Sequence, residues 1–234
     1  MAAIIFFSML TTNVITRVFN IRFNRNSGTC FTLDVDEKQY FVTAKHLVDS
    51  IKSVDNIEIF FKNQWTLLPV RLIGHSVLAD VSVLATNNFF AGHPLPASIE
   101  GMMLGQDLYF LGFPFGLQAD FGPIINWDFP MPLIKKGALS AVFFDRPEKY
   151  FLIDGINNPG FSGAPVVFSK PLTFDYKVAG VVASYRVEYN NTILNDQQIP
   201  IQAPSNTGII IAYGINNVLE IINNNPTGRP IERP

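Results

Sequence analysis

The chain has 234 residues, with 17 Lys or Arg against 19 Asp or Glu, so its formal net charge is −2. Charged residues make up 15% and hydrophobic residues 48%, which excludes a disordered chain and gives no basic surface for nucleic acid or anionic lipid. This length can bury the core of one large all-β domain or of two small ones. The single cysteine, Cys30, cannot form an intrachain disulfide, so no oxidising compartment is required.

The most apolar segment is Ala2–Leu10, whose nine residues are too few for the roughly 20 that cross a bilayer. It lacks the basic first region and the small-residue cleavage pattern of a signal peptide. The favoured interpretation is a buried arm or a first strand. We therefore expect no membrane span, and a cytoplasmic location.

Short runs rich in Val, Ile, Phe and Thr recur along the chain, separated by Gly, Pro, Asn and Asp. About a dozen such runs with turn signals between them predict an all-β sandwich or barrel. The predicted strands are Val14–Phe23, Thr29–Val35, Tyr40–Thr43, Ile57–Phe61, Val70–Ile73, Val81–Ala85, Asp107–Gly112, Ala138–Phe144, Tyr150–Ile153, Ala164–Phe168, Val178–Ser184 and Gly208–Ala212.

Helical periodicity is clear in one place, after Ile215, where Val218, Ile221 and Ile222 fall on one face. Pro226 is expected to end this short helix.

Three other segments break the strand pattern. The Pro-rich turn Gly92–Ser98 is the candidate junction between two halves of the chain, with about five or six strands on either side. Residues 118–136, rich in aromatic residues and proline, and residues 186–207, rich in Asn and Gln, are predicted to be long functional or mobile loops.

The strongest local signal is Asn158–Pro165, with the sequence NPGFSGAP, which runs directly into a predicted strand. A serine between glycines on a tight turn suits an exposed nucleophile, and Gly160 allows backbone N–H groups to converge where an oxyanion could lie. An ordinary Gly/Ser/Pro turn between strands is the alternative.

A serine nucleophile needs a base, and all three histidines precede Ser162. This order excludes the α/β-hydrolase arrangement and leaves the His–Asp–Ser order of chymotrypsin-type enzymes. His46 follows a hydrophobic strand directly and is the candidate base. His75 and His93 lie in turn-like surroundings and are expected to be solvated loop residues.

The candidate acid is Asp80, at the start of a mainly apolar strand, where a carboxylate must be paired or hydrogen-bonded. Asp49 and Asp55 have polar neighbours and are interpreted as solvated charges.

Six motifs in this order resemble the trypsin-like serine proteases, and especially their bacterial HtrA-type branch. Together they span Gly28 to Ser184, about two thirds of the chain. The motifs are Gly28–Phe31 (GTCF), Val42–Val48 (VTAKHLV), Asp80–Leu84 (DVSVL), Leu111–Leu117 (LGFPFGL), Gly137–Ala141 (GALSA) and Asp154–Pro165 (DGINNPGFSGAP).

The resemblance implies two six-stranded antiparallel β-barrels with a short C-terminal helix and an active site between the barrels. The first barrel would occupy residues 1–95 and the second 96–225, followed by a flexible tail at 226–234. Residues 118–136 form an insertion relative to the HtrA pattern, and the peptide-binding module that normally follows in that branch is missing from this sequence.

The resemblance also implies a catalytic triad of His46 as base, Asp80 as orienting acid and Ser162 as nucleophile. The oxyanion donors would be the backbone N–H groups of Gly160 and Ser162. Phe161 departs from the family pattern, because it cannot accept a newly formed N-terminal ammonium, so activation by N-terminal trimming is not expected.

The substrate pocket implied by the resemblance contains no acidic residue, which favours an apolar side chain before the cut. Its expected residues are Ile156, Ala183, Ser184, Tyr185 and Ile209.

The predicted activity is that of a serine endopeptidase acting on proteins or peptides, with no cofactor and no metal. The oligomeric state does not follow from the sequence. Two alternatives stay open: a catalytically silent barrel pair used for binding, and a membrane-associated protein using the Phe-rich amino end and residues 118–136. The second lacks the basic face of an interfacial anchor.

Overall fold

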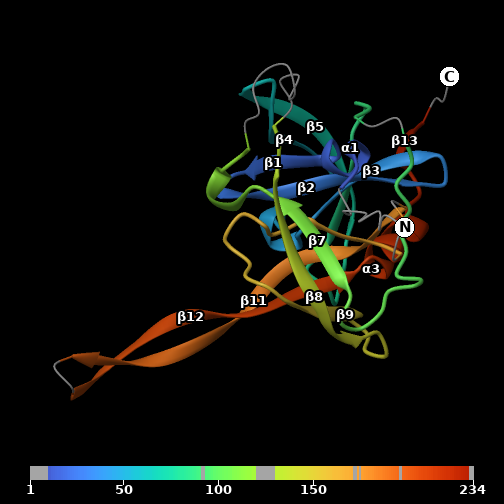
Figure 1. Cartoon of the computed structure of the whole chain (residues 1–234). Helices are drawn as coiled ribbons and strands as arrows, with labels where there is room; N and C mark the ends of the chain where they lie inside the picture. The colour runs from blue at the N-terminus through green and yellow to red at the C-terminus, as the bar shows by residue number, and fades with distance from the viewer. Residues whose placement is uncertain are drawn as a thin grey trace, which may run out of the picture.

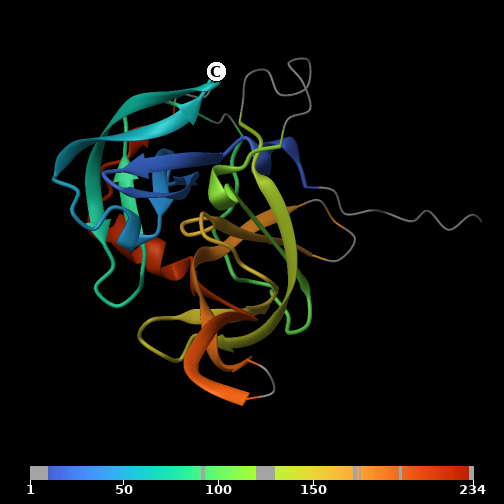
Figure 2. The same cartoon turned by 90° about the vertical axis from the view of Figure 1, so that its left-hand side faces the viewer.

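The computed structural model describes residues 10–90, 93–119, 130–170, 173, 175–194 and 197–231. Two β-sheets with antiparallel strands pack against each other, as Figures 1 and 2 show from two sides. The candidate junction at Gly92–Ser98 lies between the two sheets in the chain, although Gly92 is outside the described residues.

The first sheet has the strand order β13-β3-β2-β1-β4-β5-β6, and β3 also pairs with β6. The strands β1 to β6 therefore close into a ring, to which β13 adds beyond β3. The strands are β1 (Val18–Phe23), β2 (Asn26–Val35), β3 (Lys38–Thr43), β4 (Val54–Phe61), β5 (Gln64–His75), β6 (Ser82–Ala85) and β13 (Arg229–Pro230).

The second sheet is a closed six-stranded barrel with the order β10-β11-β12-β9-β8-β7. Its strands are β7 (Asp107–Gly112), β8 (Leu133–Phe143), β9 (Tyr150–Asp154), β10 (Pro165–Ser169), β11 (Tyr176–Leu194) and β12 (Gln197–Gly214). The predicted all-β architecture of paired barrels is confirmed.

Helices are few and short in the described part of the chain: α1 (Thr12–Ile15), the single 3₁₀ turns η1 (Lys45–Leu47) and η2 (Pro114–Gly116), and α3 (Asn216–Asn224). The helix α3 buries Val218, Ile221 and Ile222, the face that the sequence predicts. Among the described residues, no helix has the length and apolar character to span a bilayer.

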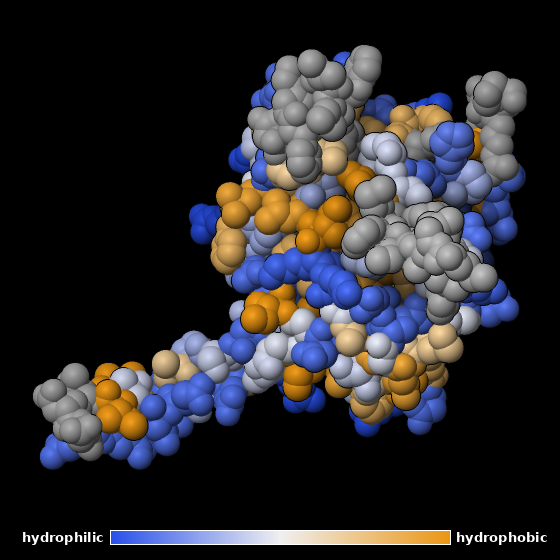
Figure 3. All heavy atoms as spheres, viewed as in Figure 1, coloured by the Kyte–Doolittle hydropathy of each residue, from blue (hydrophilic) through white to orange (hydrophobic). Residues whose placement is uncertain are grey.

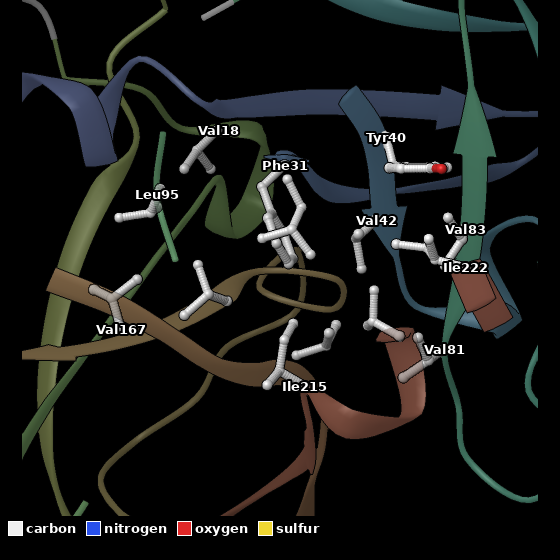
Figure 4. Packing of buried hydrophobic residues seen from close by; sticks show 14 of the residues in the cluster. Val18, Phe31, Tyr40, Val42, Val81, Val83, Leu95, Val167, Ile215 and Ile222 are labelled. Atoms are coloured by element: carbon white, nitrogen blue, oxygen red, sulfur yellow. The ribbon is translucent and has the colours of Figure 1, made fainter. Parts of the chain in front are cut away.

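A shared hydrophobic core joins the two sheets. Val42 and Val83 of the first sheet, Val167 of the second and Ile215 and Ile222 at the C-terminal helix belong to one buried cluster (Figure 4). Burial of this continuous cluster fixes the sheets relative to each other, because apolar area removed from water stabilises by roughly 25 cal/mol per Å².

Three sequence predictions about the elements of the fold are wrong. The segment Val14–Phe23 is not one strand, because α1 occupies its first residues and β1 begins at Val18. Residues 186–207 are not a loop in their described part, but a hairpin formed by the ends of β11 and β12. The tail is not free throughout, because Arg229–Pro230 pairs with β3 and Ile231 N–H donates to the Glu37 carbonyl at 2.8 Å.

The predicted loop at 118–136 is only partly described. Its last residues, from Leu133, already belong to β8, and Ala119 forms an isolated bridge with Met131. Residues 120–129 lie outside the described residues.

Candidate active site

The pairing of β3 with β6 brings His46 and Asp80 together. Thr43 at the end of β3 lies opposite Ser82 at the start of β6. Because the strands are antiparallel, the residues just after β3 and just before β6 emerge at the same end of the sheet. His46 lies there in η1, and Asp80 in the turn before β6.

Both carboxylate oxygens of Asp80 contact His46. The Asp80 Oδ2 lies 2.6 Å from His46 Nδ1, and Oδ1 accepts the His46 backbone N–H at 2.8 Å. The second bond fixes the carboxylate relative to the backbone that carries the imidazole. Asp80 therefore holds both the position and the orientation of the ring.

The hydrogen bond from Asp80 raises the pKa of His46 above its ordinary value, while partial burial of the ring lowers it and the charge of Asp49 adds a smaller upward effect. The His46 side chain is 49% exposed, so the ring edge away from Asp80 is open to a reaction partner. An exposed imidazole paired on one nitrogen suits a general base.

Ser162 lies on the turn between β9 and β10, which is fastened to both sheets. Its carbonyl accepts the Thr29 N–H of β2 at 2.9 Å, and Gly163 N–H donates to the Val182 carbonyl of β11 at 2.8 Å. A Cβ at Gly163 would meet the carbonyl oxygen of Thr29 and lie 2.5 Å from Thr43 Oγ1. The glycine thus lets the serine turn approach the end of β3, three residues before His46.

The Ser162 hydroxyl donates to the Ala183 carbonyl at 3.3 Å, a long hydrogen bond. The predicted triad residues therefore come from one end of the first sheet and from a turn packed on it. His46 and Asp80 are in contact, whereas the Ser162 hydroxyl bonds the Ala183 carbonyl and not the His46 ring.

The turn before Ser162 has a defined peptide orientation. Gly160 has φ +106°, and the Pro159 carbonyl accepts the Phe115 N–H of η2 at 2.8 Å. Because the N–H and C=O of a trans peptide point in opposite directions, the Gly160 N–H points away from η2. Within the described residues the N–H groups of Gly160 and Ser162 have no acceptor, so both are free to donate a hydrogen bond.

Lys135 is a residue at this turn that the sequence analysis missed. Its ammonium donates to the Ile156 carbonyl at 2.7 Å and to Asn158 Oδ1 at 2.6 Å, and lies 5.7 Å from the centre of the Phe161 ring. Burial lowers the pKa of this lysine. The alternation of side chains along β8 could have indicated it, because neighbouring residues of a strand point to opposite faces. Lys136 points outward and pairs with Asp107 at 2.9 Å, so the adjacent Lys135 points to the other face.

The departure at Phe161 also has a structural outcome. The side chain is fully buried and packs edge-on against Phe110, with ring centres 5.1 Å apart. Apolar packing below the turn, together with Lys135 beside it, holds the residue that precedes Ser162.

The predicted pocket residues are spread around the turn. Ala183 is buried and Tyr185 partly buried, whereas Ser184 is exposed, and Ile156 and Ile209 are 59% and 40% exposed. The neighbouring Asn157, which the sequence analysis did not select, is buried; its carbonyl accepts the Asn206 side-chain N–H at 2.6 Å, and its Oδ1 has no partner in the described residues.

Two other residues can be assigned. His75 is not a solvated loop residue, since it ends β5 and its Nδ1 lies 2.6 Å from Ser82 Oγ, while burial lowers its pKa. His93 is exposed, as predicted. Within the described ranges, His, Cys, Asp and Glu side chains form no group of three that could hold a metal.

Three solved structures share the fold at low sequence identity. The first is Rv3671c from Mycobacterium tuberculosis H37Rv, a serine-to-alanine variant in its inactive form, with 16% identity, a TM-score of 0.57 and coverage of 93% of this chain and 90% of that one. The HtrA-type protease AlgW, with a tripeptide, has 16% identity and a TM-score of 0.59, and the match covers 91% of this chain. A serine endoprotease from Yersinia pestis has 18% identity, a TM-score of 0.58 and the same 91% coverage.

This chain spans 61% of the AlgW chain and 63% of the Yersinia pestis chain. No curated protein sequence matches it. The family match is decisive: residues 28–170, more than half of the chain, match the trypsin-like peptidase domain. The chain therefore belongs to the trypsin-like peptidase family, a family of serine endopeptidases.

Proposed function

We propose that the chain hydrolyses peptide bonds with Ser162 as nucleophile, His46 as general base and Asp80 as the acid that orients His46. The observation that carries the proposal is the two-point contact of Asp80 with the His46 ring and backbone, at 2.6 and 2.8 Å. That contact lies at the end of the sheet on which the Ser162 turn packs.

The contact selects the useful form of the imidazole. With Nδ1–H donating to Asp80, Nε2 carries the lone pair and can accept the hydroxyl proton of Ser162. The serine oxygen then attacks the substrate carbonyl carbon, and His46 returns the proton to the leaving amine as the C–N bond breaks. Water repeats the sequence on the acyl-enzyme and releases the acid.

The negative charge of the tetrahedral intermediates needs donors. The N–H groups of Gly160 and Ser162 fit this role, since the bond from Phe115 N–H turns the Pro159 carbonyl away from that position. Donors fixed before the reaction lower the barrier without reorganising. An apolar side chain before the cut is proposed on the absence of acidic residues from the expected pocket.

A fluorophosphonate probe tests the proposal. The wild-type protein should form one adduct, located at Ser162 by peptide mass analysis, and hydrolysis of short peptide esters should stop with the adduct. Ser162→Ala should lose both, and His46→Ala should lose nearly all turnover, of order 10⁶ in kcat. Ser140→Ala, at an exposed position of β8, is the matched control.

A folded wild-type protein that forms no adduct would contradict the proposal and favour a silent binding module. Retention of turnover in Ser162→Ala would show that the nucleophile lies elsewhere.

A further inference from the structure

The strands β11 and β12 continue far beyond the barrel as a two-stranded hairpin, here called the arm and defined as residues Arg186–Thr207. Pairing in its described part runs from Val187 opposite Asn206 to Leu194 opposite Gln197. Figure 1 shows the arm projecting from the body of the molecule, and Figure 3 shows it as a separate extension of the surface.

Both outer edges of the arm lack a ladder in the described residues, because β12 pairs with β9 only from Ile209 onward. The edge that leads to Ser162 is that of β11. The edge of β11 that faces away from β12 pairs with β10 as far as Val181, and Val182 then bonds Ala164. The next carbonyl on β11, that of Ala183, accepts the Ser162 hydroxyl. From Ser184 to the end of β11, the described residues form no ladder on this edge, so a free strand edge begins where the proposed nucleophile lies.

The arm carries little of what normally protects an exposed edge. Natural sheets cover their edges or place charges on them, whereas this segment has three charged residues, Arg186, Glu188 and Asp196. Val187, Tyr189, Ile193 and Ile201 are 43%, 63%, 69% and 58% exposed. An isolated two-stranded hairpin is marginally stable in water, and a third strand would stabilise it.

We propose that the free edge of β11 along the arm binds the substrate as a third, antiparallel strand. The inference rests on the proposed function, and concerns the arm beyond the residues next to Ser162. The substrate is the expected partner of this edge, because the edge begins next to Ser162. A polypeptide whose scissile carbonyl lies at Ser162 therefore reaches the edge without a gap.

The direction of the bound chain follows from the pairing. If the added strand is antiparallel to β11 and its cut end lies near Ala183, the chain runs from the tip of the arm toward Ser162. The residues that lie on the arm are therefore those that precede the cut. At about 3.4 Å per residue, the eight residues Arg186–Ile193 match roughly eight upstream residues of the substrate.

This geometry defines a substrate class: an extended or unfolded polypeptide with a long segment before the cut. Backbone bonds along an edge give affinity with little sequence preference, and alternate side chains give the selection. Val187 and Tyr189 share one face by strand alternation, so apolar residues at every second upstream position are favoured.

A length series of peptides measures the effect. Substrates with one cut site and three, six or ten upstream residues are compared with substrates extended equally on the downstream side. With the intact arm, kcat/KM should rise at least about tenfold from three to ten upstream residues, and downstream extension should not reproduce the gain.

The matched variant shortens the arm by replacing residues 188–205 with Asn-Gly, which suits a two-residue hairpin turn. It keeps the Val187–Asn206 pair and the Asn206 contact to the Asn157 carbonyl. Short substrates should be hydrolysed as by the wild type, and the gain with upstream length should disappear. A gain unchanged in this variant would overturn the proposal.

A second measurement needs no variant that could misfold. Methylating alternate backbone nitrogens of the upstream segment removes the donors of one face of a ladder. One of the two alternating sets should abolish the length gain of the wild type and the other should leave it intact. Equal behaviour of both sets would contradict a strand pairing.

The outcomes separate this inference from the proposed function. Hydrolysis of the shortest peptide reports on the triad alone, whereas fluorescence anisotropy of labelled long and short peptides with the Ser162→Ala protein reports on the edge alone. If a second copy of the chain covers the edge instead, shortening the arm will lower the mass measured by light scattering and leave the length series unchanged, which refutes the proposal.

Discussion

In a Gly160→Ala variant, the new methyl group would meet the Phe113 carbonyl oxygen and lie 2.9 Å from Pro114 Cα and 3.0 Å from Phe115 N. All three are backbone atoms at η2, so no side-chain rotation can relieve the contact. The residue also has φ +106°, which L-amino acids with a side chain rarely adopt. The turn has to move, and the bond of 2.8 Å from Phe115 N–H to the Pro159 carbonyl is the first to be lost.

The size of the effect follows from what that bond orients. Once the Pro159 carbonyl is released, the peptide can rotate and take the Gly160 N–H away from the oxyanion position. Loss of one such donor costs about 10²–10³ in kcat, or about 2.7–4 kcal/mol. Strain in the altered backbone adds about 1–3 kcal/mol to the loss of folding stability.

Gly105→Ala is the matched control, because Gly105 has φ +80° and a Cβ there would have no neighbour within 4 Å. It carries the backbone strain without the clash. The kcat for a short peptide ester, the rate of fluorophosphonate labelling and the melting temperature are measured for both variants. Gly160→Ala should lose kcat far more than KM changes, whereas Gly105→Ala should lose only stability.

Equal kcat in the two variants, within about threefold, would refute the reasoning, since the turn would then contribute no fixed donor to the reaction. A Gly160→Ala protein that is unfolded at the assay temperature is recognised by its melting curve. The labelling rate is then measured at lower temperature, where the same comparison with Gly105→Ala applies.

The remaining predictions concern the pH profile, the hydrogen bonds of Lys135 to the serine turn and the packing of Phe161 below that turn. Because hydrogen bonding to Asp80 raises the pKa of His46, kcat/KM should rise with pH through a midpoint above about 6.5, and Asp80→Asn should lower that midpoint; a flat profile from pH 5 to 8 would exclude His46 as base. The same shift means that the pair's contribution to stability is full below about pH 6.5 and is lost as pH rises through the raised pKa, which unfolding titrations at several pH values can follow. Lys135→Met removes the charge-assisted hydrogen bonds to the serine turn and should lower kcat about tenfold, whereas Lys136→Met should stay near the wild-type value. Equal kcat values in the two variants would show that the Lys135 bonds are not needed for catalysis. Phe161→Ala should lower the free energy of unfolding by about 3–5 kcal/mol in denaturant titrations, and a loss below 1 kcal/mol would contradict close packing at this position.

Elements with a buried face could be predicted from the sequence. The strand β7 has the predicted bounds, Asp107–Gly112, and α3 buries the face marked by its periodicity. His46 and Asp80 could be selected from the sequence because each lies beside an apolar strand and within a family motif, and the structure brings the two side chains into contact.

Elements without a buried face escaped prediction. The arm has no core side, so its alternation of apolar and polar residues is short, as at Val187 and Tyr189, and its Asn and Gln residues favour a loop. The role of Lys135 was not predicted, because the bonding partners of its side chain lie on a turn some twenty residues later in the chain. The pairing of Arg229–Pro230 with β3 escaped for the same reason, as a contact distant in sequence.

That last contact bears on the order in which the molecule can fold. The first sheet is built from residues 18–85, yet its outermost strand is β13, and α3 packs on β5 and β6. Asn225 donates to the Ile73 carbonyl at 3.0 Å and Lys38 to the Pro226 carbonyl at 2.6 Å.

The half of the chain that leaves the ribosome first is therefore completed by segments that leave near the end. Contacts between residues this far apart in sequence close slowly, because loop entropy is lost before they form. The barrel that holds His46 and Asp80 should gain its full stability together with the second barrel, so that the paired histidine and the serine turn become ordered in one cooperative step.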